Sequence, residues 1–271
     1  MGTPTQLAAG PLPLFDSWPQ VEGRLRAAIH CALILDFDGT LVPVIDNPHE
    51  VRLDPSLRRV LRRMAQHPGA SVYIMSGRSL ADLRRQVRVP RVHLLGLHGW
   101  EKRGAKLPPE QVELLLQAKL WLAHWLPPLT GIKVEDKGGI LAVHYRGARL
   151  PEVRFAEHVM QMAGHEFRPG LRLLKGKKIW ELLPSAIPGK GPITRHLLEG
   201  MPADTLPIII GDDDSDESAF AALPHALAVR VGGEARTSAQ FFLRDPDAVR
   251  EFLERLEAVI ACKPIHPHSN S

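Results

Sequence analysis

The chain has 271 residues, of which 44% are hydrophobic and 24% charged, and a formal net charge of +4. This is ordinary globular composition, with enough apolar material for a core. The basic residues are scattered and form no run of five or six cations. We therefore expect that an anionic partner is a small molecule and that nucleic acid is excluded.

The two cysteines, Cys31 and Cys262, lie near opposite ends and form neither a metal-binding spacing nor a disulfide framework. A reducing compartment is therefore the expectation. The first residues, "MGTPTQLAAGPLPLFDSW", lack the positive region and long apolar core of a signal peptide or membrane span. We expect a cytoplasmic monomer or weak homodimer with no membrane partner, a loose proline-containing start and a polar tail, "HPHSNS".

The first third of the chain alternates apolar runs with helical patterns. In order, the predicted elements are a strand over 32–35, a helix over 53–66, a strand over 70–75, a helix over 79–87, and a strand and turn over 92–99. Asp54 can cap the first helix, and Pro55 suits its first turn. Strands and helices that alternate at this spacing predict a parallel sheet covered on both faces.

The pattern changes near residue 104, where a polar, proline-bearing break precedes a long helical pattern over 110–126. Trp121 and Trp125 lie one turn apart on this helix, and we expect both to belong to a core. The elements that follow are predicted as strands over 131–134 and 140–145, a helix over 152–163, and strands over 171–174 and 179–183. We predict a small α/β domain, residues 105–189, inserted into a larger domain formed by residues 1–104 and 190–271.

The first pattern resumes after the turn "PSAIPGKG" (184–191). The elements predicted here are a helix that begins near Pro192, a strand in "LPIIIG", a helix after the acidic turn "DDDSDE", a strand in "HALAVRV" and a closing helix over 246–260.

Three apolar runs stop at a polar cluster: "LILDFDGT", "VYIMSGR" and "PIIIGDDDSD". Because function gathers beyond the carboxyl ends of parallel strands, Asp36, Asp38, Ser76 and Asp212 meet in one crevice if these strands are neighbours. Several carboxylates in one place raise one another's pKa values unless a cation neutralises them. All the ligand atoms are oxygens, which favours Mg²⁺ over zinc.

The same residues suit phosphoryl transfer. A carboxylate beside Mg²⁺ can attack phosphorus because the metal screens the two anions, and an aspartyl phosphate is a known covalent intermediate. Ser76 offers a hydroxyl and a backbone N–H to the phosphoryl oxygens, and Lys190 offers a positive charge at the start of a helix. Alternation along a strand places Asp36 and Asp38 on one side, so we predict that one attacks while the other handles a proton.

Each cluster taken alone has a simpler interpretation. Asp-x-Asp after a strand can cap a turn, Ser-Gly-Arg is usually a turn, and "GDDDSDE" can cap a helix and complement its dipole. The three clusters in this order, with Lys190 just before the third, favour a functional site.

These motifs resemble those of the haloacid-dehalogenase-like phosphatases from about residue 30 to residue 260. "DFDGT" matches the first motif, Ser76 the second, Lys190 the third and "GDDDSD" the fourth. The resemblance implies an α/β fold with a Rossmann-like parallel-sheet core of the haloacid-dehalogenase type and an inserted α/β cap domain.

It implies that Asp36 is the nucleophile, that Asp38 is the general acid and base, and that Ser76 and Lys190 hold the phosphoryl group. The Mg²⁺ ligands it implies are Asp36, Asp38 through its backbone carbonyl, and Asp212, with Asp213 and Asp216 as nearby support.

A narrower resemblance is to the trehalose-6-phosphate phosphatases, through "SGR", "GLHGWE", "VEDKGGILAVHYR", "KKIWELLP" and "GKG". It implies a substrate site that comprises Gly77, Arg78, His98, which mainly orients its loop, and the cap residues Glu135, Lys137, Arg146 and Glu181. Such carboxylates and cations can bind sugar hydroxyls and phosphate. Without the resemblance, the four cap residues also fit an exposed strand pair, a surface arginine and a partner for Lys177.

We therefore expect a Mg²⁺-dependent phosphatase of trehalose biosynthesis that hydrolyses trehalose 6-phosphate through an aspartyl phosphate. The alternative is another sugar-phosphate phosphatase or a phosphomutase of the same superfamily, which only the cap would distinguish. A phosphorylated signalling receiver would use similar acids at strand ends but would need neither Asp38 nor an inserted domain. A catalytically silent sensor would not need the intact set of catalytic residues.

Overall fold

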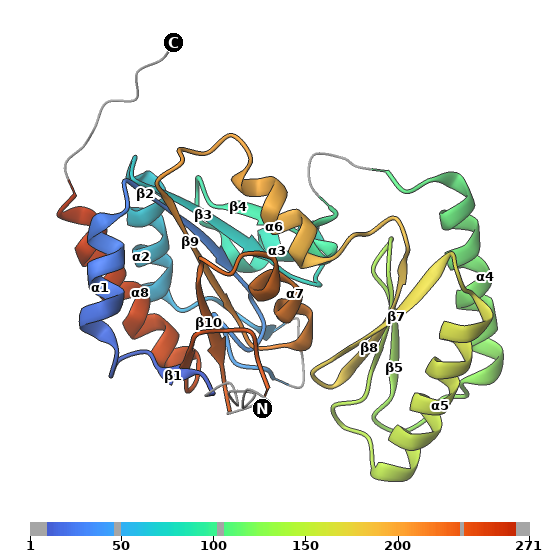
Figure 1. Ribbon diagram of the computed structural model, residues 1–271. Helices are drawn as coiled ribbons and strands as arrows, with labels where there is room; N and C mark the ends of the chain where they lie inside the picture. Colours follow the sequence, from blue (N-terminus) through green and yellow to red (C-terminus); the bar gives the residue numbers. More distant parts are fainter. Residues whose placement is uncertain (1–9, 46–49, 102–105, 234–235, 264–271) are drawn as a thin grey trace, which may run out of the picture.

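The computed structural model describes residues 10–45, 50–101, 106–233 and 236–263, which form two β-sheets with helices around them (Figure 1). The larger sheet has seven parallel strands in the order β1-β11-β10-β9-β2-β3-β4, and the smaller has four antiparallel strands in the order β5-β6-β8-β7. The predicted α/β class with a parallel sheet is confirmed.

The larger sheet and its helices come from both ends of the chain. The strands are β1 Leu12–Pro13, β2 His30–Leu35, β3 Ala70–Met75, β4 His93–Leu95, β9 Thr205–Gly211, β10 Leu227–Val231 and β11 Phe241–Leu243. The helices are α1 Trp18–Ala27, α2 Pro55–Gln66, α3 Leu80–Val87, α6 Lys190–Leu198, α7 Asp214–Ala222 and α8 Pro246–Ala261. Asp54 caps α2 as predicted, because its side chain accepts hydrogen bonds from the first turn.

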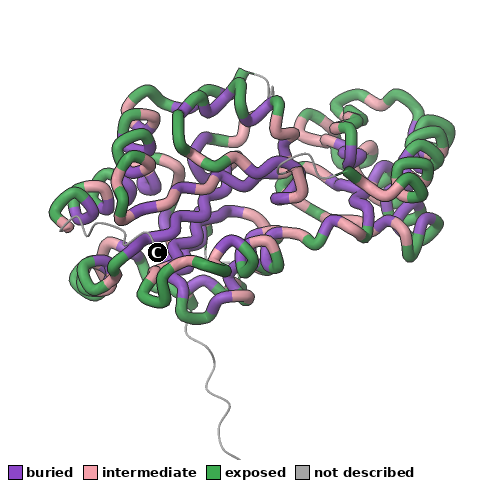
Figure 2. Tube along the Cα trace, turned by 90° about the horizontal axis from the view of Figure 1, so that it is seen from above, coloured by how far each residue is buried: buried purple, intermediate pink, exposed green. Residues whose placement is uncertain are grey.

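Helices cover both faces of the parallel sheet because its central strands are apolar on both faces. In β2, Leu33 and Leu35 belong to the core that α1, α2, α3 and α8 share, whereas Ala32 and Ile34 belong to the core under α6 and α7. Figure 1 shows α1, α2 and α8 on the opposite side of the sheet from α6 and α7. The central strands are the most continuously buried part of the chain (Figure 2).

The antiparallel sheet and two helices make up the smaller unit. Its strands are β5 Lys133–Asp136, β6 Leu141–His144, β7 Leu171–Gly176 and β8 Ile179–Pro184, and its helices are α4 Pro109–Trp125 and α5 Leu150–Glu166. The helices lie on the side of this sheet that faces away from the larger unit, and their outer turns are exposed (Figures 1 and 2). All these elements lie within the predicted insert, 105–189, whereas its predicted start after residue 104 falls outside the described residues.

Two expectations from the sequence are wrong. The start of the chain is not loose from residue 10 onward, because Leu12 pairs with Phe241 and α1 buries Val21 and Leu25. β1, α1 and β11 were not predicted, and β1 and β11 are too short for a periodic signal. Trp125 is not a core residue, since it is 48% exposed at the end of α4, while Trp121 is half-buried. The first nine residues and the polar tail lie outside the described residues.

Cys31 is buried in β2, Cys262 is exposed, and neither forms a disulfide. No helix in the described ranges combines the length and the apolar character needed to cross a bilayer.

Phe252 of α8 tests the packing of the N-terminal helix. It is fully buried, and its ring meets that of Trp18 in α1 edge to face, with the centroids 6.3 Å apart. Phe252→Ala should lower the free energy of unfolding by about 3–5 kcal/mol, because it leaves a cavity in a close-packed core. Urea titration measures the loss, with Phe155→Ala, on the exposed side of α5, as the control. Equal effects of the two variants would contradict the described packing.

Candidate active site

The predicted polar clusters meet because the three strands that precede them are neighbours. β2 pairs with β3 on one side and with β9 on the other, all in parallel. Asp36, Ser76 and Asp212 each follow directly on the last residue of one of these strands. The carboxyl ends of three adjacent strands therefore place the three side chains at one edge of the sheet.

Every residue predicted for catalysis, substrate binding or metal binding lines one cavity of about 610 Å³, to which both units contribute, whereas Asp216, predicted as nearby support, does not line it. From the larger unit come Asp36, Asp38, Ser76, Gly77, Arg78, His98, Lys190 and Asp212, and from the smaller unit come Glu135, Lys137, Arg146 and Glu181. The structure thus brings these residues together, while their individual roles stay predictions.

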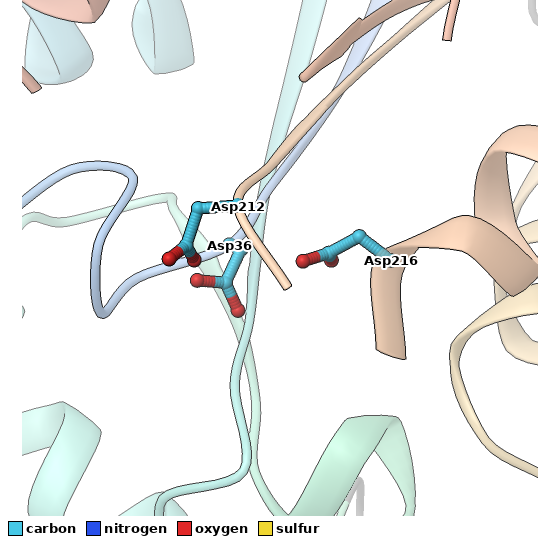
Figure 3. Close-up of side chains that lie close together, drawn as sticks. All are labelled: Asp36, Asp212 and Asp216. Carbon is cyan, nitrogen blue, oxygen red and sulfur yellow. The ribbon is translucent and has the colours of Figure 1, made fainter. Parts of the chain in front are cut away.

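Three buried carboxylates lie close together at the cavity, and two of them, Asp36 and Asp212, line its wall. Asp36, Asp212 and Asp216 each contribute one oxygen to a group whose members lie within 4.8 Å of one another (Figure 3). Lys190, at the start of α6, donates hydrogen bonds to Asp36 Oδ1 at 2.6 Å and to Asp216 Oδ1 at 2.8 Å. Asp216, predicted only as nearby support, is a full member of this cluster, whereas the side chain of Asp38 is held elsewhere, by Arg78.

Burial and mutual repulsion determine the electrostatics of the cluster. Burial, together with Asp216 and Asp212, raises the pKa of Asp36 well above its ordinary value, although Lys190 opposes the rise. Burial raises the pKa of Asp212 to about 6 against the opposing effect of Lys177. Burial lowers the pKa of Lys190, but Asp216 and Asp36 outweigh it, and the net shift is upward. Lys190 therefore stays positively charged, but its single charge does not balance the charges of the three carboxylates around it.

The cluster fits a divalent cation that prefers oxygen ligands. Asp212 Oδ1 is buried and, among the described residues, accepts no hydrogen bond. Gly39, at φ +88°, passes so close that a Cβ there would lie 2.1 Å from Asp212 Oδ2. Because an unpartnered buried carboxylate oxygen is costly, and because the donor atoms are all carboxylate oxygens, the site is suited to Mg²⁺.

Asp38 is held by a guanidinium that a second carboxylate shares. Arg78 Nε and Nη2 donate to the two oxygens of Asp38 at 2.6 and 2.7 Å, and Arg78 Nη1 donates to Asp82 at 2.5 Å. Burial lowers the pKa of Arg78, but Asp38 and Asp82 outweigh it and raise it. Arg78 thus fixes the orientation of the Asp38 side chain. Asp36 and Asp38 both line the cavity, as predicted, but their side chains pair with different residues, Asp36 with Lys190 and Asp38 with Arg78.

Ser76 offers less than the sequence suggested. Its backbone N–H donates to Leu95 O at 3.0 Å, so this group is already used within the fold. Its hydroxyl oxygen accepts a hydrogen bond from the backbone N–H of Arg78 at 3.2 Å. The hydroxyl proton is therefore the donor that Ser76 can direct at a ligand.

The acidic turn before α7 also caps that helix, as the simpler interpretation of "GDDDSDE" proposed. Asp213 accepts from Asp214 N at 2.7 Å, and Asp216 Oδ2 accepts from Asp213 N at 3.1 Å. Because Asp216 Oδ1 also binds Lys190, one side chain both caps the helix and belongs to the carboxylate cluster. The two interpretations are compatible.

The antiparallel sheet turns a charged face towards the cavity. Glu135 Oε2 and His144 Nε2 are 2.8 Å apart, and Glu181 binds both Lys137 and His98 at 2.7 Å. Arg146 reaches across to the larger unit and donates to the backbone carbonyl of Ile45. Except for His98, which comes from the larger unit, these side chains belong to strands β5, β6 and β8 or to the residues that follow them.

The residues of this site that were not predicted include Lys177, Asp82 and His144. Lys177, at the tip of the β7–β8 hairpin, donates to Asp212 Oδ2 at 2.8 Å. Asp82 lies one turn beyond Arg78 at the start of α3, and His144 supports Glu135. Asp82 follows Arg78 by four residues, a spacing typical of paired charges, but Lys177 meets Asp212 only through the tertiary fold.

The family model and the curated relatives that match this chain agree on one family. Residues 34–247 match the family model described as trehalose-phosphatase. The trehalose-phosphate phosphatase of Mycobacterium leprae is 33% identical over an alignment of 248 residues, which covers 83% of this chain and 57% of that protein. The chain therefore spans little more than half the length of this relative.

Solved structures share the fold. The C-terminal domain of Candida albicans trehalose-6-phosphate phosphatase matches with a TM-score of 0.82 and 22% identity, over 93% of this chain and 99% of that chain. A haloacid dehalogenase-like hydrolase from Bacteroides thetaiotaomicron matches with a TM-score of 0.57 and 18% identity, over 84% and 99%. The predicted Rossmann-like core of the haloacid-dehalogenase type, with an additional antiparallel sheet, is confirmed.

The raised pKa of Asp212 predicts how stability depends on pH when a chelator is present. Its pKa is 3.8 in the unfolded reference and about 6 in the folded protein, so the folded state binds the proton more tightly. The stabilisation is complete below about pH 4 and is lost as pH rises through about 6, by at most about 3 kcal/mol.

Urea unfolding at a series of pH values tests this dependence. Asp212→Asn should flatten the decline between about pH 4 and 7, whereas Asp136→Asn, at an exposed pair with Lys119, should retain it. An unchanged slope in Asp212→Asn would show that Asp212 does not titrate as described.

Proposed function

The chain belongs to the trehalose-phosphatase family, and from this premise we propose that it is a Mg²⁺-dependent phosphatase that hydrolyses trehalose 6-phosphate to trehalose and phosphate. The observation that carries the proposal is the position of Asp36. It lies buried between Lys190 and two further carboxylates, in a cavity whose opposite wall carries charged side chains of the antiparallel sheet. The wall around Asp36 and Lys190 suits a phosphoryl group, and the opposite wall, from the antiparallel sheet, suits a polar sugar.

Asp36 and Asp212 would hold the Mg²⁺ ion, with Asp216 beside them and the backbone carbonyl of Asp38 as the further ligand that the family resemblance implies. When bound, the ion would supply the positive charge that allows carboxylates and a phosphate dianion to share one site. Lys190 already supplies one such charge, in contact with both Asp36 and Asp216.

In the first step, Asp36 attacks phosphorus while the bond from phosphorus to the sugar oxygen breaks. Asp38 gives that oxygen a proton, so trehalose leaves as a neutral alcohol and Asp36 carries the phosphoryl group. Asp38 is then an anion, which the bidentate contact with Arg78 stabilises. Lys190 and the Ser76 hydroxyl donate to the transferring phosphoryl oxygens.

In the second step, Asp38 takes a proton from water, and the resulting hydroxide attacks phosphorus. The bond between phosphorus and Asp36 breaks, phosphate leaves, and both aspartates return to their starting protonation states. The antiparallel unit acts as the cap, residues 105–189, that keeps bulk water away from the aspartyl phosphate.

The sugar would contact the charged face of the cap. Glu135, held by His144, can accept hydrogen bonds from sugar hydroxyls, and Arg146 and Lys137 carry cationic donors at the same wall. These side chains would distinguish a disaccharide phosphate from the smaller phosphate esters that the larger unit alone could accept.

Phosphate release from a panel of sugar phosphates tests the substrate. Trehalose 6-phosphate should give a kcat/KM at least about tenfold above that for glucose 6-phosphate, mannose 6-phosphate and sucrose 6-phosphate, because only it matches both walls. A chelator should abolish release and added Mg²⁺ should restore it. Preference for another ester, or activity that persists in the chelator, would contradict the substrate or the metal assignment respectively.

Asp36→Asn tests the nucleophile. An amide cannot form the acyl phosphate, so turnover should fall by roughly 10³-fold or more while the fold is retained. Circular dichroism and urea unfolding provide the control for folding. Phosphate release at the wild-type rate would exclude the covalent route through Asp36.

A further inference from the structure

Asp82, in the first turn of α3, holds a second edge of the guanidinium that orients Asp38. Arg78 uses Nε and Nη2 for the two oxygens of Asp38, and its remaining nitrogen, Nη1, donates to Asp82 Oδ2 at 2.5 Å. The ring of the buried Phe37 lies beneath the guanidinium, 5.5 Å from its central carbon. Because the guanidinium is planar and rigid, contacts along two of its edges fix its orientation better than one pair alone.

Asp82 is fixed by its own helix. Its second oxygen, Oδ1, accepts from Arg85 Nη2 at 3.0 Å and from Gln86 Nε2 at 3.5 Å. Its backbone N–H donates to the side chain of Ser79, which caps α3. Burial raises the pKa of Asp82, but Arg78 and the other partners outweigh it and lower the pKa. Asp82 is therefore an anion held on a regular element, where the helix dipole also favours a negative charge.

The exposure of the three side chains shows which of them a substrate can reach. The side chain of Asp38 is 23% exposed, whereas those of Arg78 and Asp82 are 8% and 11% exposed. Asp36 pairs with a different cation, Lys190, so the two aspartates of the first motif are held by separate sets of residues. The contact with Arg78 therefore couples Asp82 to Asp38, the proton donor of the proposed reaction.

We propose that Asp82 is a positioning residue for the step in which the sugar leaves: it fixes the Arg78 guanidinium, which in turn fixes the Asp38 side chain that protonates the leaving oxygen. The proposal rests on the proposed phosphatase function, in which Asp38 is the general acid. A proton donor must lie within hydrogen-bond reach of the oxygen that it protonates. Displacement of Asp38 should therefore slow an ester in proportion to its need for that proton.

Three phosphate esters separate this role from a structural one. Trehalose 6-phosphate and phenyl phosphate have leaving groups that need a proton, whereas 4-nitrophenyl phosphate, similar in size to phenyl phosphate, releases a stable anion. In Asp82→Ala, kcat/KM should fall by roughly ten- to hundredfold for the first two esters and by less than about threefold for 4-nitrophenyl phosphate. Equal losses for the two aryl esters would overturn the proposal, because they would place Asp82 in phosphate binding or in folding alone.

This measurement is insensitive to two complications. The value of kcat/KM reports the steps up to departure of the leaving group, so the later reaction with water does not enter. The ratio of the kcat/KM values for the two aryl esters does not depend on the fraction of enzyme that is folded, so a variant that folds poorly still gives an answer.

A matched variant controls for the helix dipole. Asp247→Ala removes an acid from the first turn of α8, where it pairs with the half-exposed Arg250 at 3.2 Å, and should leave all three rates unchanged. If Asp247→Ala changed the ratio for the two aryl esters as much as Asp82→Ala, the effect would not depend on Arg78 and the proposal would be overturned.

A double-mutant cycle tests whether Asp82 acts through Arg78. In an Arg78→Ala background, Asp82→Ala should cause no further loss of kcat/KM with phenyl phosphate, because the group that transmits its effect is already absent. Losses that multiply in the double variant would overturn the proposal.

The side-chain Nε–H of Arg78 gives a readout without turnover. Its bond to Asp38 at 2.6 Å should protect this proton from exchange with water, and its signal in a nitrogen-edited NMR spectrum is identified by its absence in Arg78→Lys. Asp82→Ala should speed this exchange by about tenfold or more, and unchanged exchange would overturn the proposal. If wild type hydrolyses none of the three esters, the proposed function fails by itself, and this proton still decides whether Asp82 holds Arg78 against Asp38.

Discussion

Three carboxylates cannot share a buried space without positive charge, and the ends of β2 and β9, with the first turn of α7, place Asp36, Asp212 and Asp216 in such a space. Lys190 supplies one fixed cation, but burial still raises the pKa of Asp36 and of Asp212. The remaining deficit of positive charge explains why the site suits a divalent ion. It also explains why an anionic phosphate ester could bind beside these carboxylates once such an ion is present.

The antiparallel unit completes the site from the opposite side. It contributes Lys177 to the carboxylate cluster, and Arg146 and Lys137 to the backbone carbonyls of Ile45 and Gly77 in the larger unit. These three contacts come from separate strands or turns of one sheet, so the smaller unit meets the larger one at several points. The face that lines the cavity from the smaller unit therefore also lies against the strand ends that carry Asp36 and Ser76.

The strand-end acids were predictable because a parallel sheet, unlike most folds, places the carboxyl ends of neighbouring strands together. The residues that pair with those acids were not predictable from the sequence. That Arg78 binds Asp38 and Asp82, and that Lys177 reaches Asp212, depends on how loops and hairpins fold back, which local periodicity does not encode. Trp125 was misjudged for a related reason: a one-turn spacing of aromatic residues indicates a shared face but not whether that face is covered.

The phosphoryl group itself offers the most direct test of the central claim, which is that the carboxylate cluster uses Asp36 to carry it. Wild-type protein is mixed with trehalose 6-phosphate and Mg²⁺, quenched in acid within milliseconds, digested and analysed by mass spectrometry. The account predicts a phosphorylated peptide with the modification on Asp36, formed and lost within one turnover. Phosphate release without any phosphorylated peptide, or with the phosphoryl group on another residue, would contradict it.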